Sequence, residues 1–434
     1  MLQPPDGMIS SLGKVQTEVI NHPASIVEPA RELPVSAFYD VVVAGGGIAG
    51  VAAAIASVRS GVSVCLLEKE SALGGLATLG NVTVWLPICD GRGRQVIGGI
   101  AEELLKLSVA DLRQDDREAR FLRIPSCWLP GGDVEQRKKT RYQVEFNPGS
   151  YSLAIEKLVT DSGVAMLYDT RVCAVCRDAD RITHLIVENK SGRSAIACRA
   201  VVDATGDADV CWLAGEETES LDSNVLCGWF YTLRDGILHL NALSHPYNAD
   251  AGKQDLDGPF FRGDDAAQVT AQILGARDLI RKRVAALRRD RPDSDIQVFA
   301  PPAIACFRMT RRLVGALSLG ERHIHTWFDD AVGLTGDWRR KGPVYSIPLA
   351  SLTGVRNHNL LAAGRCISAD TTVWDVTRAI PTCAVTGEAA GAAAALAVRL
   401  TSGNVSRLSI AALQRELRVR GVLIEPELVR LTEG

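Results

Sequence analysis

Apolar stretches and helix-like segments alternate along most of this chain. Residues 38–44 are rich in aromatic and β-branched side chains, which predicts a buried strand. Residues 45–50 then turn the chain into a helix over 51–60, and Gly61 is a suitable C-terminal cap for it. A second apolar run at 63–67 predicts the next strand. Together these residues predict one complete strand–helix–strand unit.

The rest of the chain predicts further elements and a change of character in the middle. Short turns separate three consecutive strand patterns, so we expect a small antiparallel sheet there. Residues 216–345 are less regular and indicate an inserted second domain. The predicted elements are a helix over 151–162, strands over 164–168, 171–177, 182–189 and 194–202, a helix over 266–289, a strand over 360–363 and a helix over 382–400.

Residues 45–50 fit the pattern G-x-G-x-x-G between the first predicted strand and helix. In this pattern Gly45 permits the tight turn, Gly47 lets a pyrophosphate approach the backbone, and Gly50 lets helix and strand pack closely. The helix N-terminus offers N–H groups and a partial positive charge to the phosphates. Glu68 follows the second strand and is placed to accept hydrogen bonds from ribose hydroxyls. The unit predicts a dinucleotide site and leaves FAD and NAD as alternatives.

Three later segments favour FAD over NAD. Small residues at 74–80 would let the backbone pass close to a flat ring system and its ribityl chain. Residues 204–207 end a strand over 200–203 and give a second close approach. Residues 362–365 end a strand far downstream and lead to 380–382, where the last long helix begins. An NAD-dependent dehydrogenase would leave these three segments unexplained.

At these residues the chain resembles the FAD-dependent oxidoreductases of the glutathione-reductase-like fold, on the branch shared with the succinate dehydrogenase flavoprotein. Within that branch it is most similar to a group of bacterial FAD-dependent oxidoreductases of mostly unassigned substrate. The resemblance is weakest in the insert. The matching segments are 39–50, 67–80, 86–103, 144–158, 201–209 and 359–395.

The resemblance implies an α/β fold, with a Rossmann-type FAD-binding domain and an inserted α+β substrate or cap domain. It also implies hydride transfer between a small organic substrate and N5 of the flavin. The final helix would point its N-terminus at the flavin and stabilise negative charge there. The expected domains are an N-terminal extension at 1–35, a discontinuous FAD domain at 36–84, 148–215 and 346–402, a cap at 85–147 and 216–345, and a C-terminal helical segment at 403–434.

Individual cofactor roles also follow from the resemblance. Arg365 stands where many relatives carry an aspartate that binds the ribitol, so the chain departs from the wider pattern there. The implied FAD-binding residues are Gly45, Gly47, Gly50, Glu68 and Lys69 for the ADP half, Gly75, Thr78 and Gly80 for the ribityl chain and flavin, Gly206 on the adenine side, Gly364 and Arg365 at the ribitol, and Thr382 at the start of the last helix.

Three residues are candidates for catalysis. Arg378 lies shortly before the last helix and would clamp an anionic substrate, or else pair with Asp375. Cys89 follows the flavin-contacting glycines as a candidate for covalent attachment to the flavin or for a catalytic thiol, or else is a packed small residue. His325 and His323 would share a face on a strand, as acid and base or as metal ligands, or else are surface or core histidines.

Tyr345 and Trp338 are candidate walls of a substrate pocket. Cys173 and Cys176 form a C-x-x-C, but a strand would point them to opposite faces, so two ordinary strand cysteines are favoured over a redox pair. No second pair of ligands accompanies them in the sequence, and we expect no metal site. Most of the other arginines of the second half are expected to be solvated or paired with Asp329, Asp330 or Asp337. These other arginines are Arg308, Arg311, Arg312, Arg339 and Arg340.

Composition narrows the class of partners. An apolar content of 47% and a charged content of 23% are typical of a soluble globular protein, and a net charge of −3 gives no reason to expect nucleic acid. Eleven scattered cysteines without a signal-peptide pattern favour the cytoplasm. The apolar run 389–398 is too short to span a membrane and predicts a buried helix. A homo-oligomer, a separate electron acceptor or reductase, a flavin monooxygenase and a non-catalytic binding protein stay open as alternatives.

Overall fold

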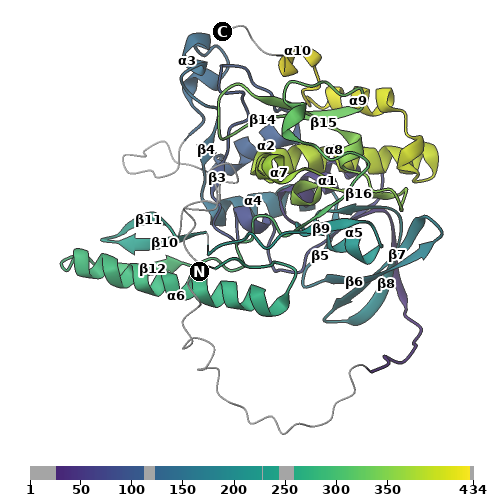
Figure 1. Ribbon diagram of the computed structural model, residues 1–434, viewed down its shortest axis with the longest axis horizontal. Helices are drawn as coiled ribbons and strands as arrows, with labels where there is room; N and C mark the ends of the chain where they lie inside the picture. The colour runs from purple at the N-terminus through teal and green to yellow at the C-terminus, as the bar shows by residue number, and fades with distance from the viewer. Residues whose placement is uncertain (1–25, 112–122, 227, 244–258, 431–434) are drawn as a thin grey trace. The chain divides into compact units, whose positions relative to one another are not determined.

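The computed structural model describes residues 26–111, 123–226, 228–243 and 259–430 (Figure 1). The chain divides into two units, Met1–Pro34 and Val35–Gly434, and every helix and strand given below belongs to the second. The further division of that unit into an FAD-binding domain and a cap stays a prediction.

A seven-stranded sheet, in the order β5-β2-β1-β8-β7-β6 with β16 also paired to β8, forms the centre of the second unit. β5, β2, β1, β8 and β16 run parallel to one another, whereas β7 is antiparallel to both β8 and β6. Val41, Val42 and Val43 of β1 are fully buried, as expected of a parallel strand covered on both faces. The strands are β1 Val35–Ala44, β2 Val64–Leu67, β5 Ala165–Leu167, β6 Arg171–Asp178, β7 Arg181–Asn189, β8 Gly192–Asp203 and β16 Leu360–Ala362.

β8 links the antiparallel strands of this sheet to its parallel strands. Along one edge it pairs with β1, up to Asp203. Along the other edge it pairs first with β7 and then, from Val201 onward, with β16. The expected antiparallel pairing of β6, β7 and β8 is confirmed, and β8 joins these strands to the parallel part of one larger sheet.

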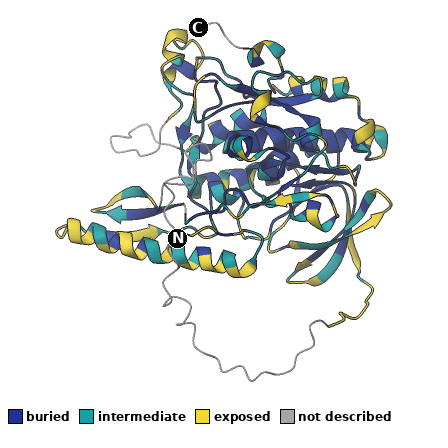
Figure 2. Ribbon diagram, viewed as in Figure 1, coloured by how far each residue is buried: buried dark blue, intermediate teal, exposed yellow. Residues whose placement is uncertain are grey.

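Two helices, α1 (Ile48–Arg59) and α8 (Ile380–Thr401), pack against each other in the buried centre that Figure 2 shows in dark blue. A Cβ at Gly387 would lie 2.1 Å from the carbonyl oxygen of Ala49, and one at Gly391 would lie 2.1 Å from that of Ala53. Because these contacts advance together along both helices, α1 and α8 run in the same direction. Both N-termini therefore lie at the carboxyl ends of the parallel strands.

α8 is the one helix of the described part that is long and apolar enough to cross a membrane by length and composition. In the structure, 89% of its most apolar window is buried inside the protein. The helix is longer than the apolar run at 389–398, because small polar residues such as Thr382 and Thr386 extend it toward its start and are buried as well. α8 is thus a core helix of this fold.

A second, antiparallel sheet of β11, β10 and β12 lies beside the long helix α6 (Figure 1). α6 buries a single narrow stripe, Gln272, Ala276, Ile280 and Val284, at four-residue spacing. The predicted helix over 266–289 is confirmed here. The elements are β10 Trp229–Arg234, β11 Ile237–Ala242, β12 Ile296–Ala300 and α6 Ala266–Asp290.

Shorter elements complete the second unit. The hairpin of β14 (Ala331–Gly336) and β15 (Val344–Pro348) packs on α8, where a Cβ at Gly333 would lie 2.3 Å from a methyl carbon of Val385. The predicted helix over 151–162 begins a few residues early, because Asn147 caps it and a proline occupies its first turn. The remaining elements are η1 Gly75–Ala77, β3 Val84–Trp85, α2 Ile100–Ser108, η2 Ser126–Trp128, α3 Val134–Arg137, β4 Val144–Glu145, α4 Pro148–Asp161, α5 Asp209–Leu213, β9 Thr218–Ser220, β13 Arg311–Leu313, η4 Glu321–His323, η5 Leu349–Ser351, η6 Gly364–Cys366, α7 Thr371–Thr377, η7 Val405–Arg407, α9 Ile410–Val419 and α10 Pro426–Val429.

Candidate functional site

The first glycine loop joins β1 to α1 and is tightly packed against its neighbours. Gly45 has a φ of +98°, which residues with a side chain rarely adopt, and its Cβ would lie 2.4 Å from the carbonyl oxygen of Ala204. A Cβ at Gly50 would lie 1.7 Å from the carbonyl oxygen of Gly45. This packing agrees with the tight turn and the close helix–strand contact expected of these two glycines.

Gly47 differs, because a Cβ there would meet no atom of the described residues within 4 Å. It is the N-cap of α1, and no side chain in the described part of the chain caps the first N–H groups of that helix. These N–H groups and the helix dipole favour an anion. The open side of Gly47 is therefore where a phosphate can approach the backbone.

Glu68 follows β2 and lies next to this loop, with its side chain buried. One carboxylate oxygen accepts a hydrogen bond from the amide of Gly46 at 2.6 Å, and the other accepts one from the amide of Glu70 at 2.8 Å. The carboxylate is fixed in place and keeps further acceptor sites for hydroxyl groups. Lys69 is exposed, and its place near an adenine stays a prediction.

The second glycine segment lies against the first. Gly74 pairs with Gly47 in an isolated parallel bridge, and its amide donates to the carbonyl of Gly46 at 2.8 Å. A Cβ at Gly75 would lie 3.3 Å from the Cα of Gly47. The structure thus brings together two glycine segments that the sequence separates by more than twenty residues.

Thr78 and Gly80 hold the turn that follows. The hydroxyl of Thr78 donates to the carbonyl of Leu73 at 2.5 Å. A Cβ at Gly80 would lie 2.9 Å from the Cα of Leu76, so the chain passes itself closely there. Both residues shape the backbone of the turn, and their contact with a ribityl chain or flavin stays a prediction.

The third and fourth segments predicted from the sequence, 204–207 and 362–365, lie at the carboxyl ends of β8 and β16. The guanidinium of Arg365 donates to the carbonyl of Gly206 at 3.1 Å and to the carbonyl of Phe307. It also forms an ion pair with Asp207 at 3.2 Å. The side chain of Arg365 therefore ties three segments together, and its predicted contact with the ribitol stays a prediction.

α8 begins beside Gly364, whose amide donates to the hydroxyl of Thr386 at 2.9 Å. A Cβ at Gly364 would lie 2.8 Å from the Cβ of Ala49 in the first turn of α1 and 3.6 Å from the sulfur of Cys383 in the first turn of α8, so Gly364 lies against both turns. No side chain of the described residues caps the first turn of α8. In that turn the hydroxyl of Thr382 lies 2.8 Å from the hydroxyl of Thr335 on β14, a neighbour that sequence reasoning missed.

These segments meet at the carboxyl ends of β1, β2, β8 and β16, which is where open α/β sheets bind their ligands. Because Gly387 lies level with Ala49, the first turn of α8 extends past that of α1 by roughly 9 Å at 1.5 Å per residue. The edge presents an open glycine backbone, an anchored carboxylate and two separate groups of N–H donors. This set of donors and acceptors fits an extended dinucleotide with a pyrophosphate.

Arg378 directly follows α7 and is buried just before α8. Its guanidinium forms an ion pair with Asp375, whose carboxylate is fully buried. The indole N–H of Trp338 donates to the carbonyl of Asp375 at 3.0 Å, so the structure brings two predicted substrate residues to one place. The ion pair expected as the alternative role of Arg378 is present, and its contact with substrate stays a prediction.

Tyr345 on β15 is fully buried, in an apolar cluster with Met309, Leu319 and Trp374. Burial, reinforced by the negative charge of Asp337, raises the pKa of Tyr345 to about 12. The phenol therefore stays protonated near neutral pH and is unsuited to act as a base.

Cys89 and His325 both occupy packed positions. Burial raises the pKa of the Cys89 thiol, and its sulfur accepts a hydrogen bond from the amide of Tyr142 at 3.3 Å. His325 follows η4 in a turn, so the two neighbouring histidines do not share the face of a strand. Its Nδ1 lies 2.6 Å from the carbonyl oxygen of Val429. Across the described ranges, no three His, Cys, Asp or Glu side chains gather as metal ligands.

Of the other arginines, Arg339 and Arg340 pair with Asp337 as expected, whereas Arg311 and Arg312 pair with acidic residues that were not predicted. Sequence reasoning also missed Arg308. Arg308 is only 8% exposed, and no hydrogen bond or ion pair of its guanidinium is found within the described part of the chain. No sequence signal identifies it, because the partner of an arginine depends on tertiary structure. The pairs formed by the rest are Arg311–Asp209 at 2.6 Å, Arg312–Glu219 at 2.6 Å, Arg339–Asp337 at 2.9 Å and Arg340–Asp337 at 3.1 Å.

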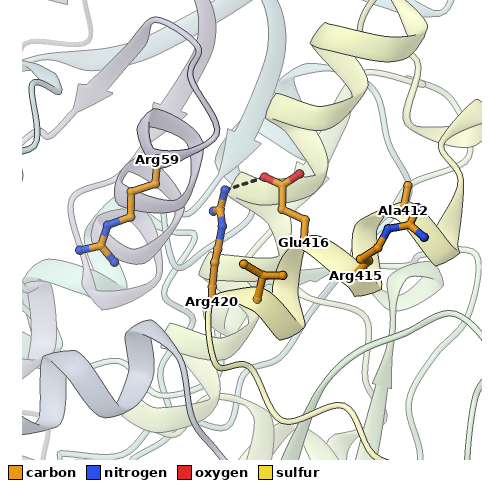
Figure 3. A pocket seen from close by; sticks show the side chains of 6 residues that line it. Arg59, Ala412, Arg415, Glu416 and Arg420 are labelled. Atoms are coloured by element: carbon orange, nitrogen blue, oxygen red, sulfur yellow. Dashed lines mark hydrogen bonds and ion pairs between the residues drawn. The ribbon is translucent and has the colours of Figure 1, made fainter.

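An open recess of about 570 Å³ lies away from this edge, between the end of α1 and α9 (Figure 3). Arg59 ends α1, so it lies roughly 18 Å along the helix from Gly47. Arg420 and Glu416, which both line the recess, form an ion pair with each other. The recess is separate from the glycine segments. Its lining residues are Arg59, Ala412, Arg415, Glu416, Val419 and Arg420.

Fold and site together define a Rossmann-type dinucleotide-binding protein. The chain belongs to the FAD-dependent oxidoreductase family, whose model matches residues 40–224 and 264–417. The protein is accordingly an FAD-dependent enzyme, as the glycine segments predicted. The gap in the match falls inside the region 216–345, where the resemblance in sequence was weakest.

Individual relatives are distant. A thioredoxin reductase of Ureaplasma parvum serovar 3 is 38% identical over 72 residues, which cover 17% of this chain and only 23% of that enzyme. A p-nitrophenol 4-monooxygenase of Pseudomonas putida DLL-E4 is 11% identical, with a TM-score of 0.42 over 91% of this chain and 96% of that one. A geranylgeranyl bacteriochlorophyll reductase-like protein of Thermoplasma acidophilum is 12% identical, with a TM-score of 0.40 over 91% and 95%. A flavocytochrome c3 fumarate reductase in its open conformation is 14% identical, with a TM-score of 0.38 over 83% and 78%.

Proposed function

We propose that the protein oxidises or reduces a small organic substrate by hydride transfer at N5 of its flavin. The observation that carries the proposal is the meeting of two uncapped helix N-termini, those of α1 and α8, with glycine segments at one edge of the sheet. FAD, when bound, supplies the hydride acceptor or donor. The chain supplies binding, orientation and exclusion of water.

Each part of the edge suits one part of the cofactor. The open backbone at Gly47 and the first turn of α1 would bind the pyrophosphate, and Glu68 would bind ribose hydroxyls. The first turn of α8 would stabilise negative charge on the flavin ring. The buried side chains of Trp374 and Tyr345 would keep water from the substrate side.

The proposal is tested on the purified protein in two steps. Denaturation followed by chromatography should release FAD, and recovery of FMN, NAD or no nucleotide would contradict the site. Metabolites are then screened anaerobically for bleaching of the bound flavin. A substrate that bleaches it without oxygen supports hydride transfer. A substrate that is hydroxylated with consumption of oxygen and NADPH would establish a monooxygenase instead.

We also propose that a separate reductase or electron acceptor completes the cycle. In the described part of residues 216–345 the strands β10, β11 and β12 are antiparallel, so that region offers no parallel strand–helix–strand unit for a nicotinamide dinucleotide. NADH and NADPH should therefore reduce the isolated protein slowly. Rapid and saturable bleaching by either nucleotide would show that this proposal is wrong.

A further inference from the structure

Arg308 belongs to a segment that connects two parts of the candidate FAD site. At one end of this segment, the amide of Ala303 donates to the carbonyl of Leu79 in the second glycine turn at 2.8 Å. At the other end, the carbonyl of Phe307 accepts a hydrogen bond from Arg365 at the end of β16. Arg308 is the next residue, so it lies where the cap region meets the flavin-binding edge.

The guanidinium of Arg308 is buried beside an aromatic ring. Its central carbon lies 4.8 Å from the centre of the ring of Trp229 on β10, and the whole residue is 8% exposed. Its Nε has no hydrogen-bond partner, and no carboxylate of the described residues pairs with it. A guanidinium stays charged in proteins, so its burial without an anion is unfavourable. The contact with Trp229 offsets only part of this.

The neighbouring arginines do not share this condition. Arg312 lies on the same stretch of chain, is also buried and also stacks on a tryptophan, but it pairs with Glu219 at 2.6 Å. Arg311 pairs with Asp209, and Arg365 with Asp207. Of these four arginines, Arg308 alone leaves one positive charge uncompensated within the described residues.

We propose that Arg308 binds a carboxylate group of the substrate, beside the ring of Trp229. This inference rests on the proposed function, because it names the chemical class of the substrate that meets the flavin. A single guanidinium offers two parallel N–H donors, which match the two oxygens of one carboxylate and its single charge. A phosphate carries more charge and more oxygens than this one cation can compensate.

Small carboxylates provide the test, with the FAD-loaded enzyme and without any need for turnover. Benzoate and succinate are titrated against the visible spectrum of the bound flavin and against thermal stability, with benzamide and succinamide as uncharged analogues. Arg308→Met is compared with Arg312→Met, which removes a buried, tryptophan-stacked arginine from the same segment. At least one carboxylate should bind to the wild type and to Arg312→Met. The dissociation constant of that carboxylate should rise at least tenfold in Arg308→Met. The uncharged amides should bind to the wild type no more tightly than they bind to Arg308→Met.

Several results would overturn the assignment. Loss of FAD from folded Arg308→Met would show that this arginine holds the cofactor. Equal carboxylate binding in Arg308→Met and the wild type would place the carboxylate elsewhere, and a response to inorganic phosphate alone would identify another anion. If neither carboxylate binds to the wild type, the proposal is also wrong. These outcomes do not decide the proposed function. The proposal of hydride transfer is contradicted only if no substrate reduces the flavin anaerobically.

Without added anion, Arg308→Met should be at least as stable as the wild type, because it removes an uncompensated buried charge. Arg312→Met should be less stable, since it breaks an ion pair. A marked loss of thermal stability in Arg308→Met alone would indicate that its charge is already compensated inside the protein, and would also overturn the proposal.

Discussion

Gly387 of α8 lies directly against Ala49 of α1, so close that a Cβ at Gly387 would fall 2.1 Å from the carbonyl oxygen of Ala49. Backbone touches backbone at this point, and a single methyl group has no room. The contact fixes the depth of α8 relative to α1. It therefore also fixes the position of two helix N-termini at the FAD site.

Gly387→Ala should destabilise the protein and weaken FAD binding together. The added methyl must push the helices apart, and overpacking of this kind costs about 1–3 kcal/mol. That loss exceeds the gain of up to about 1 kcal/mol that alanine gives in a helix. Chemical unfolding and FAD retention after dialysis measure the two effects.

Gly275→Ala is the matched control for this prediction. Gly275 also lies inside a long helix, α6, but a Cβ there would meet only the flexible side chain of Leu226, at 3.1 Å. This variant should be as stable as the wild type or slightly more so. Equal effects of the two substitutions would show that the contact between α1 and α8 is not the cause.

Local features of this site were predictable from the sequence, and long-range ones were not. The strand, the glycine turn and helix α1 follow from apolar patterning and from the steric needs of Gly45 and Gly50. The residues of β8 were predicted as strand, but its pairing with both the antiparallel and the parallel strands was not, because one strand can pair with different neighbours along its length. Arg308 was missed for a related reason, since its lack of a carboxylate partner depends on segments distant in sequence.

Glu68→Gln should weaken FAD binding about tenfold, since a charged hydrogen bond contributes roughly 1–1.5 kcal/mol more than a neutral one. The amide oxygen of glutamine can still accept the hydrogen bond from Gly46, but its NH2 group cannot accept the one from Glu70, so the apo fold should be kept with a modest loss of stability. Equilibrium titration of the apoprotein with FAD measures the change. Glu70→Gln, two residues further on, should bind FAD as the wild type does. An unchanged dissociation constant in Glu68→Gln would mean that another residue holds the ribose.

Glu388 on α8 predicts a specific dependence of stability on pH. Its carboxylate is 1% exposed, and one oxygen accepts a hydrogen bond from the amide of Ile100 at 2.7 Å. Burial raises the pKa of Glu388 from 4.5 to about 7. The folded protein therefore holds this proton more tightly than the unfolded chain does. The contribution of Glu388 to stability is greatest below about pH 4.5 and is lost as the pH rises toward 7.

Glu388→Gln removes this titration and isolates its effect. The free energy of unfolding of the wild type falls with pH as Glu388 ionises, whereas that of the variant does not. At about 1.4 kcal/mol per pH unit, the difference between variant and wild type should therefore shift by roughly 2–3 kcal/mol in favour of the variant between pH 5 and pH 8. Denaturant unfolding at several pH values measures the difference. A constant difference between the two proteins across this range would contradict the raised pKa of Glu388.

Arg378→Met should lose stability, and its rate of flavin reduction tests whether Arg378 also contacts the substrate. The substitution leaves Asp375 fully buried, and among the described residues Arg339 at 3.9 Å is the one remaining cation paired with it. Breaking a buried ion pair costs about 3–5 kcal/mol, and the remaining arginine should reduce this loss to roughly 2–4 kcal/mol. If the ion pair is the only role of Arg378, the folded fraction should bind FAD, and substrate should reduce the bound flavin at the normal rate. Thermal stability, flavin content and single-turnover reduction of one preparation test this.

A second substitution separates the ion-pair role of Arg378 from a role in substrate binding. The double variant Arg378→Met with Asp375→Asn replaces the buried carboxylate by a neutral amide, so much of the lost stability should return. A structural ion pair predicts that flavin reduction stays normal per folded molecule in both variants. If stability returns but reduction remains at least tenfold slower, the guanidinium of Arg378 contacts the substrate, because removing an uncompensated aspartate does not replace a lost donor. The two variants thus distinguish a residue that only compensates the buried charge of Asp375 from one that also binds substrate.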